Sequence, residues 1–226
     1  MHIEPGVVYG AKMALAVGTA AASAVIGAKL ALDTIRQDGP VAFLTRSVLA
    51  TIAVFVFFEV LPHYPVGVSE VHLILGSTIF LIFGAGPAAI GLAGGLLIQG
   101  LFFAPYDLPQ YFINVTTLIV PLGAVSLLAK RIIPAKTPYV EVSYAQALAL
   151  STAYQGGIVA WVAFWAFYGQ GFGAENLANV ASFGGAYMLV VLIEPLADLA
   201  VLAAAKTGAS LLGGTALVNR RVYSPA

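Results

Sequence analysis

Histidines are the side chains with which this chain is best equipped to do chemistry, and the first of them is the second residue. In the opening MHIEPG, the free amine of Met1, the amide nitrogen of His2 and the His2 imidazole can close two fused chelate rings on one metal ion. Three nitrogens in a plane with an open fourth position suit Ni²⁺ or Cu²⁺, and imidazole also suits cobalt and zinc. The opening therefore predicts a metal-binding N-terminus that Pro5 and Gly6 fold back onto the protein. The alternative is an ordinary mobile tail.

A later histidine is the expected fourth ligand. His72 lies in PVGVSEVHLILGS, just before or at the start of an expected uncharged helix. The alternative role for His72 is a helix-entry residue bonded to a neighbouring carbonyl. His63, in LPHYP, is interpreted as an interfacial residue with a minor part in metal entry. The chain has no cysteine, which excludes thiolate sites and disulfides.

Polar residues inside apolar segments are further candidates. Two roles fit Asn114, in YFINVTT, and Gln99, in LLIQG. Either these side chains hydrogen-bond the metal ligands and hold their orientation, or they form hydrogen bonds between helices. Glu194 and Asp198 are four residues apart and share a helix face. Three roles are open for this pair: a paired-carboxylate acid/base site, contacts in helix packing, or a pairing with Arg46.

The composition indicates an all-α integral membrane protein. Hydrophobic residues make up 60% of the chain and charged residues 9%, against about 25% charged in soluble domains. Zero net charge without a basic patch argues against nucleic acid as a partner. The start lacks the basic region of a secretory signal, so we expect Met1 to be retained. No soluble domain or linker is evident, and residues 1–226 are interpreted as one transmembrane domain.

Seven apolar segments are predicted, and the third is short enough to be a tilted or re-entrant piece. They span about 8–32, 43–61, 71–83, 87–103, 108–128, 144–168 and 178–205. Lys and Arg mark cytoplasmic loops. If seven segments alternate, every basic residue except Lys12 falls on one side. This places the N-terminus and all the histidines outside and the C-terminus in the cytoplasm.

Several of these stretches together resemble the CbiM/NikM family, the substrate-binding membrane subunits of energy-coupling-factor (ECF) transporters for cobalt and nickel. The resemblance rests on MHI with Gly6, GVS and HL between Gly67 and Gly76, LLIQGLFF, and INVTT around Asn114. It implies seven helices with an external N-terminus, and metal ligands at Met1, His2 and His72. Gln99, Asn114, Ser69 and His63 are then candidates to support those ligands. Two departures are visible, because Glu4 precedes Pro5 and the serine–histidine spacing at Ser69–His72 is one residue longer.

The resemblance further implies Co²⁺ or Ni²⁺ as transported substrate and no catalytic cofactor. Expected partners are a transmembrane coupling subunit, cytoplasmic ATPase subunits, a small accessory membrane protein and the lipid of the inner (cytoplasmic) cell membrane. The chain contains no P-loop, so it is not itself the ATPase. Metal binding is expected to weaken as pH falls, because protons compete for the nitrogens. The rival interpretations are an intramembrane enzyme using Glu194 and Asp198, and a carrier of another small molecule.

Overall fold

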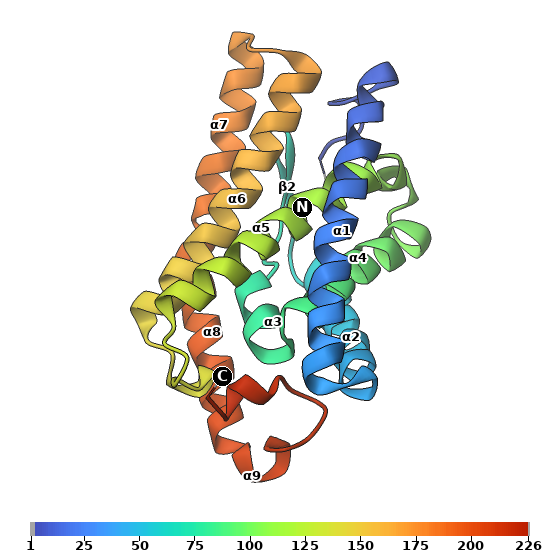
Figure 1. Cartoon of the computed structure of the whole chain (residues 1–226). Helices are drawn as coiled ribbons and strands as arrows, with labels where there is room; N and C mark the ends of the chain where they lie inside the picture. The colour runs from blue at the N-terminus through green and yellow to red at the C-terminus, as the bar shows by residue number, and fades with distance from the viewer. Residues whose placement is uncertain (1–2, 226) are drawn as a thin grey trace.

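The computed structural model describes residues 3–225 (Figure 1). The protein is an all-α integral membrane protein. Within those residues, six helices are long and apolar enough to cross a bilayer. They are Gly10–Asp38, Pro40–Val60, Ala85–Phe102, Pro105–Ile132, Tyr144–Gln170 and Ala174–Thr207. The predicted fold class is confirmed, but a seventh helix of membrane length is not found, because the third apolar segment forms no such helix.

The elements follow one another with short connections. The α-helices and strands are α1 (Met13–Asp38), α2 (Pro40–Phe55), β1 (Tyr64–Val66), β2 (Ser69–Val71), α3 (Gly76–Phe83), α4 (Ala85–Phe102), α5 (Tyr111–Ile132), α6 (Tyr144–Gln170), α7 (Ala174–Met188), α8 (Val190–Thr207) and α9 (Ala209–Leu212). Short 3₁₀ helices span Gly10–Lys12, Pro105–Gln110, Tyr139–Glu141 and Arg220–Val222, and a π-helical turn, Val56–Val60, continues α2. The last predicted segment is thus two helices that meet at Leu189.

The third apolar segment combines an extended stretch with a short helix. β1 and β2 pair as an antiparallel hairpin that the sequence did not predict. Residues 72–75 then lead to α3 without forming a helix or a strand, and Leu75 adopts a left-handed conformation. Eight helical residues rise only about 12 Å, well short of a hydrocarbon core of roughly 30 Å. Of the possibilities left open for this segment, a piece too short to span as a helix fits α3, which lies in the lower half of Figure 1.

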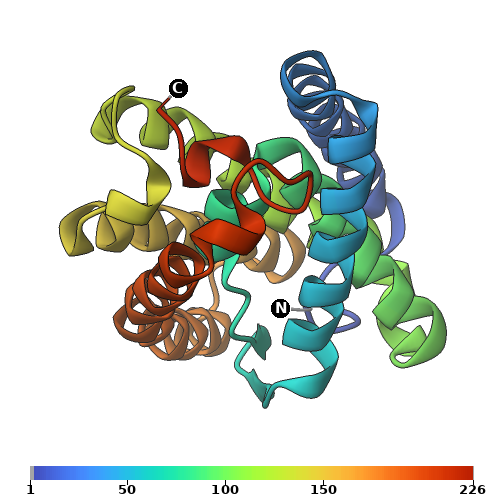
Figure 2. The same ribbon diagram turned by 90° about the horizontal axis from the view of Figure 1, so that it is seen from below.

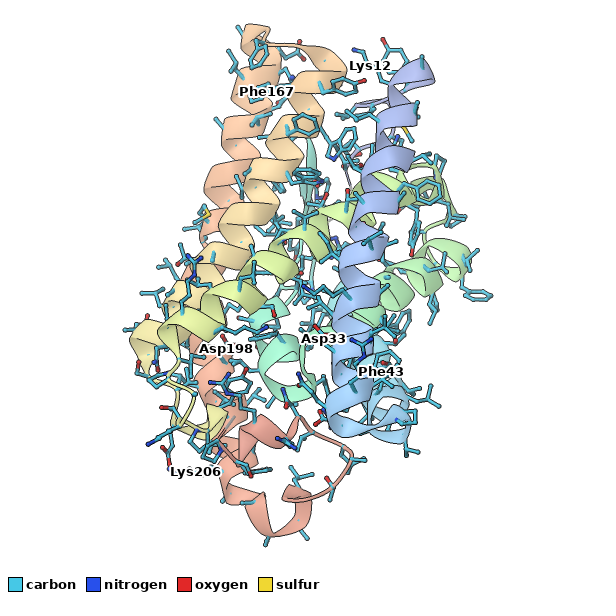
Figure 3. The ribbon with its side chains drawn as sticks, viewed as in Figure 1. Lys12, Asp33, Phe43, Phe167, Asp198 and Lys206 are labelled. Atoms are coloured by element: carbon cyan, nitrogen blue, oxygen red, sulfur yellow. The ribbon has the colours of Figure 1, made fainter. Side chains whose placement is uncertain are left out.

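The end of α1, which carries Arg36, and the end of α8, which carries Lys206, both lie at the lower end of Figure 1. Seen from that end, the chain after α8 folds back across the bundle (Figure 2). A cavity of about 550 Å³ opens there, and its lining includes Asp33, Arg46, Lys130, Arg220 and Arg221. Lys12 lies at the opposite end (Figure 3), where its Nζ donates to the Gly169 carbonyl over 2.8 Å. The charge separation predicted from the sequence is therefore present in the fold.

A pairing with Arg46 was one of the roles left open for Glu194 and Asp198, and the structure gives Arg46 other partners. Its guanidinium forms an ion pair with Asp38 at 2.8 Å and donates to the Ala216 carbonyl at 3.2 Å. Arg46 therefore joins α2 to the end of α1 and to the C-terminal segment.

Glycines allow α4 to approach α2 closely, and this contact gives a stability prediction. A Cβ on Gly91 would lie 2.6 Å from the Cβ of Ala50 and 2.8 Å from its backbone carbon. Gly91→Ala is expected to lower the stability by roughly 1–3 kcal/mol through overpacking. Thermal unfolding in detergent measures this.

Gly156→Ala is the matched control, because a Cβ there meets nothing within 4 Å. This variant is expected to leave the unfolding temperature unchanged or to raise it slightly, since alanine is the better helix former. Equal unfolding temperatures for Gly91→Ala and Gly156→Ala would contradict the tight contact between α2 and α4.

Candidate metal centre

The chain near the N-terminus is docked by its backbone. The Ile3 amide donates to Asn114 Oδ1 at 3.0 Å, and Ile3 forms an antiparallel bridge with Ser69 of β2. The Glu4 amide donates to the Val68 carbonyl at 3.1 Å. The Ile3 side chain is only 1% exposed. The segment therefore lies against the hairpin edge instead of extending into solvent.

The next residues are held by two further elements. The Val8 carbonyl accepts from Gln110 Nε2 at 3.2 Å. The Val7 carbonyl packs on α6 at Gly169, where a Cβ would lie 1.9 Å from the carbonyl oxygen. Gly6 adopts a positive φ of 91°, which glycine tolerates without strain. The fold-back predicted from Pro5 and Gly6 is thus confirmed.

His72 is fully buried and lies directly after β2, in the irregular stretch that leads to α3. Of the two expected positions, just before a helix or at its start, the structure has the first, since α3 begins at Gly76. Its Nε2 is 3.0 Å from Glu70 Oε2. The His63 ring stacks on it at a centroid distance of 4.8 Å, and the Phe58 ring meets it edge-on at 5.3 Å. Three neighbours therefore fix the orientation of the His72 ring.

The contact with Glu70 determines which His72 nitrogen carries a lone pair. In a neutral imidazole one nitrogen donates and the other accepts. If Nε2 carries the hydrogen that Glu70 accepts, Nδ1 is the basic nitrogen. A carboxylate behind the imidazole is the support that metal-binding histidines usually have, because it fixes the tautomer and raises the basicity.

The other predicted supporting residues lie at different distances from His72. Ser69 and His63 are neighbours through the hairpin and the ring stack, and Asn114 holds Ile3. Gln99 is linked to His72 through Phe58, whose ring meets His72. Gln99 Nε2 is 3.4 Å from the Phe58 carbonyl and 3.2 Å from Glu59 Oε2. It supports the turn that carries Phe58.

Two acidic residues of this region were missed by sequence reasoning. Glu70 is in β2, two positions before His72, and its carboxylate reaches the His72 ring. Asp107 is buried and lines a small cavity with Asn114 and Tyr111. Burial and the charge of Glu70 raise the pKa of Glu4. Acidic side chains are therefore gathered near Glu70, the partner of His72, an environment that favours the approach of a cation.

Metal ligands are not complete within the described part of the chain. Among residues 3–225, no group of three or more His, Cys, Asp or Glu side chains is arranged to hold a metal ion. Met1 and His2 lie outside the described residues, so their role as ligands stays a prediction.

A comparison with protein families identifies one match over most of the chain. Residues 2–210 match the family model CbiM, described as the cobalt uptake substrate-specific transmembrane region. No curated protein and no solved structure matches significantly.

The bond from Ile3 to Asn114 gives a prediction that does not depend on metal. Asn114→Ala leaves a buried amide unsatisfied, at a cost of roughly 1–3 kcal/mol. The Ile3 amide is then expected to exchange its hydrogen with solvent roughly tenfold faster or more. Hydrogen–deuterium exchange of the N-terminal peptide measures this.

Asn114→Asp is the matched control, because it keeps an acceptor oxygen at the same position. It is expected to retain most of the protection. Equal protection in Asn114→Ala and the unchanged protein would show that this bond does not hold the N-terminal segment.

Proposed function

Because the chain belongs to the CbiM family of cobalt uptake substrate-specific transmembrane regions, we propose that it is the metal-capturing membrane subunit of an ECF-type transporter. The antiparallel bridge between Ile3 and Ser69 carries this proposal. It brings the start of the chain to the segment that contains His72. A chain that carried another small molecule would not need its first residues docked beside a buried histidine.

The proposed ligands are the Met1 amine, the His2 amide and imidazole, and His72 Nδ1. In an antiparallel pairing, the residues before one partner run beside those after the other, so we expect Met1 and His2 to run toward the residues that follow Ser69. His72 follows Ser69 by three positions. We therefore expect the N-terminal chelate to meet His72, with Glu70 fixing the imidazole from behind.

Cobalt is the proposed substrate, in agreement with the description of the family. A planar set of nitrogens also favours nickel, so we propose that Ni²⁺ competes with Co²⁺ for the same ligands. The acidic side chains gathered near Glu70 raise the local concentration of either divalent cation. The metal is transported and plays no catalytic part, and the chain is proposed not to be an enzyme.

Release toward the cytoplasm requires partners, because no P-loop is present in the chain. We propose a transmembrane coupling subunit and cytoplasmic ATPase subunits, with a small accessory membrane protein as a further partner. The proposed location is the cytoplasmic membrane. The end with the basic residues then faces the cytoplasm, in agreement with the positive-inside rule, and the hairpin end faces outward.

Removing either proposed histidine ligand is expected to abolish tight cobalt binding. His2→Ala and His72→Ala each delete a direct nitrogen ligand, so the affinity is expected to fall by more than the roughly 10–100-fold typical of losing a supporting residue. One extra residue before Met1 is expected to have the same effect, because it replaces the terminal amine with an amide. Isothermal titration with Co²⁺ measures this on protein whose native N-terminus is verified by mass spectrometry.

His63→Ala is the control for the loss of an imidazole near the site, and a smaller decrease is expected. If the extended protein bound Co²⁺ as tightly as the native chain, the terminal amine would not be a ligand. The proposal would then fail in its central feature.

Glu70 is expected to increase the Co²⁺ affinity by holding the His72 imidazole, and not through its charge alone. Glu70→Ala removes the acceptor for Nε2, and a loss of roughly 10–100-fold in Co²⁺ affinity is expected. Glu175→Ala removes the same charge from an exposed position at the start of α7, and no change is expected. Similar losses in both variants would reduce the role of Glu70 to general attraction of cations.

A further inference from the structure

Two carboxylates lie buried inside the bundle, away from the hairpin. Glu194 and Asp198 are one turn apart on α8, and neither is exposed to solvent. Figure 3 places Asp198 in the lower half, beside α3. They belong to a helix long and apolar enough to span the membrane. Ionisable residues at such depth are costly and usually have a function.

Side chains from two other helices surround the pair. The Ser77 amide donates to Glu194 Oε1 at 3.3 Å, and its hydroxyl donates to Asp198 Oδ2 at 2.8 Å. Thr78 also donates to Asp198. From α6, Ser151 Oγ and Gln155 Nε2 donate to Glu194 Oε2 at 2.7 and 2.5 Å. Ser77 thus bridges the two carboxyl groups.

The pair lacks a positive partner within the described residues. The ion pairs found among residues 3–225 are Arg46 with Asp38 and His72 with Glu70. Arg221, near the lower end, donates to the carbonyls of Ile133 and Pro134 and lies over the Tyr139 ring. The titratable side chains facing the pair from α6 and α7 are Tyr154 and Tyr187.

Two negative charges so close together in an apolar interior would be very costly without compensation. Neutral hydroxyls and an amide stabilise a carboxylate but do not cancel its charge. One bound cation would reduce the net charge of the pair from two to one and remove most of the repulsion.

Two unpartnered polar atoms lie beside the pair and point to such a ligand independently. Gln155 Oε1 and the Tyr154 hydroxyl are buried, and neither has a hydrogen-bond partner among the described residues. The other end of the same Gln155 amide contacts Glu194. The Tyr154 ring packs on Gly76, where a Cβ would lie 2.1 Å from the ring. An unmet acceptor oxygen next to a carboxyl group is a position that a bound proton or metal cation satisfies.

We propose that Glu194, Asp198 and Gln155 form a binding site for one small monovalent cation, a proton or Na⁺, within the membrane. Carboxylate, hydroxyl and amide oxygens are hard donors that suit such a cation and are poor competitors for cobalt held by nitrogen. The site is separate from the proposed cobalt ligands and does not depend on them. Its occupant stabilises the first turn of α3.

Infrared spectroscopy of the protein in lipid at neutral pH tests the site, because a protonated carboxyl has a carbonyl band separate from the amide and carboxylate bands. Spectra are recorded with Na⁺ and with choline as the cation. A band present in both salts and lost in Glu194→Gln/Asp198→Asn identifies a bound proton. A band that appears only when Na⁺ is absent, and is lost in the same variant, identifies Na⁺.

The control is Glu175→Gln, which removes an exposed carboxyl group and is expected to leave the band unchanged. If neither salt gives a band that the double variant removes, both carboxyl groups are ionised without a small cation and the proposal is overturned. Thermal unfolding in detergent reports whether the double variant is folded, and this readout does not depend on the proposed cobalt ligands.

A second variant covers the case in which the double variant does not fold. Ser151→Ala removes one hydroxyl that donates to Glu194 but keeps both carboxyl groups. It is expected to shift the position of the carbonyl band, or to change the Na⁺ concentration at which the band disappears. A spectrum identical to that of the unchanged protein in both salts would overturn the assignment of the band to this pair.

Discussion

Backbone pairing between the start of the chain and the hairpin is the constraint on which the candidate metal centre depends. A free chain end loses much conformational entropy when it is fixed. Here the loss is offset by the bonds of Ile3 and Glu4 and by the burial of Ile3, Val7 and Val8. Glycines make this docking possible, because at Gly169 a side chain would collide with the Val7 carbonyl. A pre-docked end loses less entropy when it binds a ligand, which is how preorganisation increases affinity.

The stretch between β2 and α3 is irregular backbone inside a helical membrane protein, and its residues His72 and Ile74 are fully buried. Such backbone is tolerated where protein and not lipid surrounds it. Gly67 at the hairpin turn illustrates the fit, since it has a φ of 62° and a Cβ would lie 2.0 Å from the Asn179 carbonyl oxygen on α7. Leu75, just before α3, has a φ of 53°, which is a strained value for a bulky residue. The bonds of Ser77 and Thr78 to α8 hold the chain in this conformation.

The sequence predicted what depends on composition and on local pattern. Hydropathy found the long helices, the basic residues marked one end, and Pro5 with Gly6 indicated the fold-back. It did not predict the hairpin, because a stretch such as VHLIL is equally apolar as helix or strand. That error hid the contact of Glu70 with His72, since residues two apart do not face each other on a helix. The pairing of Arg46 with Asp38 was also missed, because hydropathy says nothing about how helix ends meet.

A short piece of chain joins the surroundings of His72 to the pair of carboxyl groups on α8. The two sites differ in the type of atom that they offer to a cation. The proposed cobalt ligands are nitrogen atoms, whereas the α8 pair offers carboxylate oxygens. His72 and Ser77 are five residues apart, with the left-handed Leu75 between them. A change of charge at Glu194 and Asp198 would act first on Ser77 and Thr78, which are bonded to the pair. Because packed interiors transmit displacement instead of absorbing it, the short stretch through Leu75 is the path by which a displacement of α3 would reach the chain at His72.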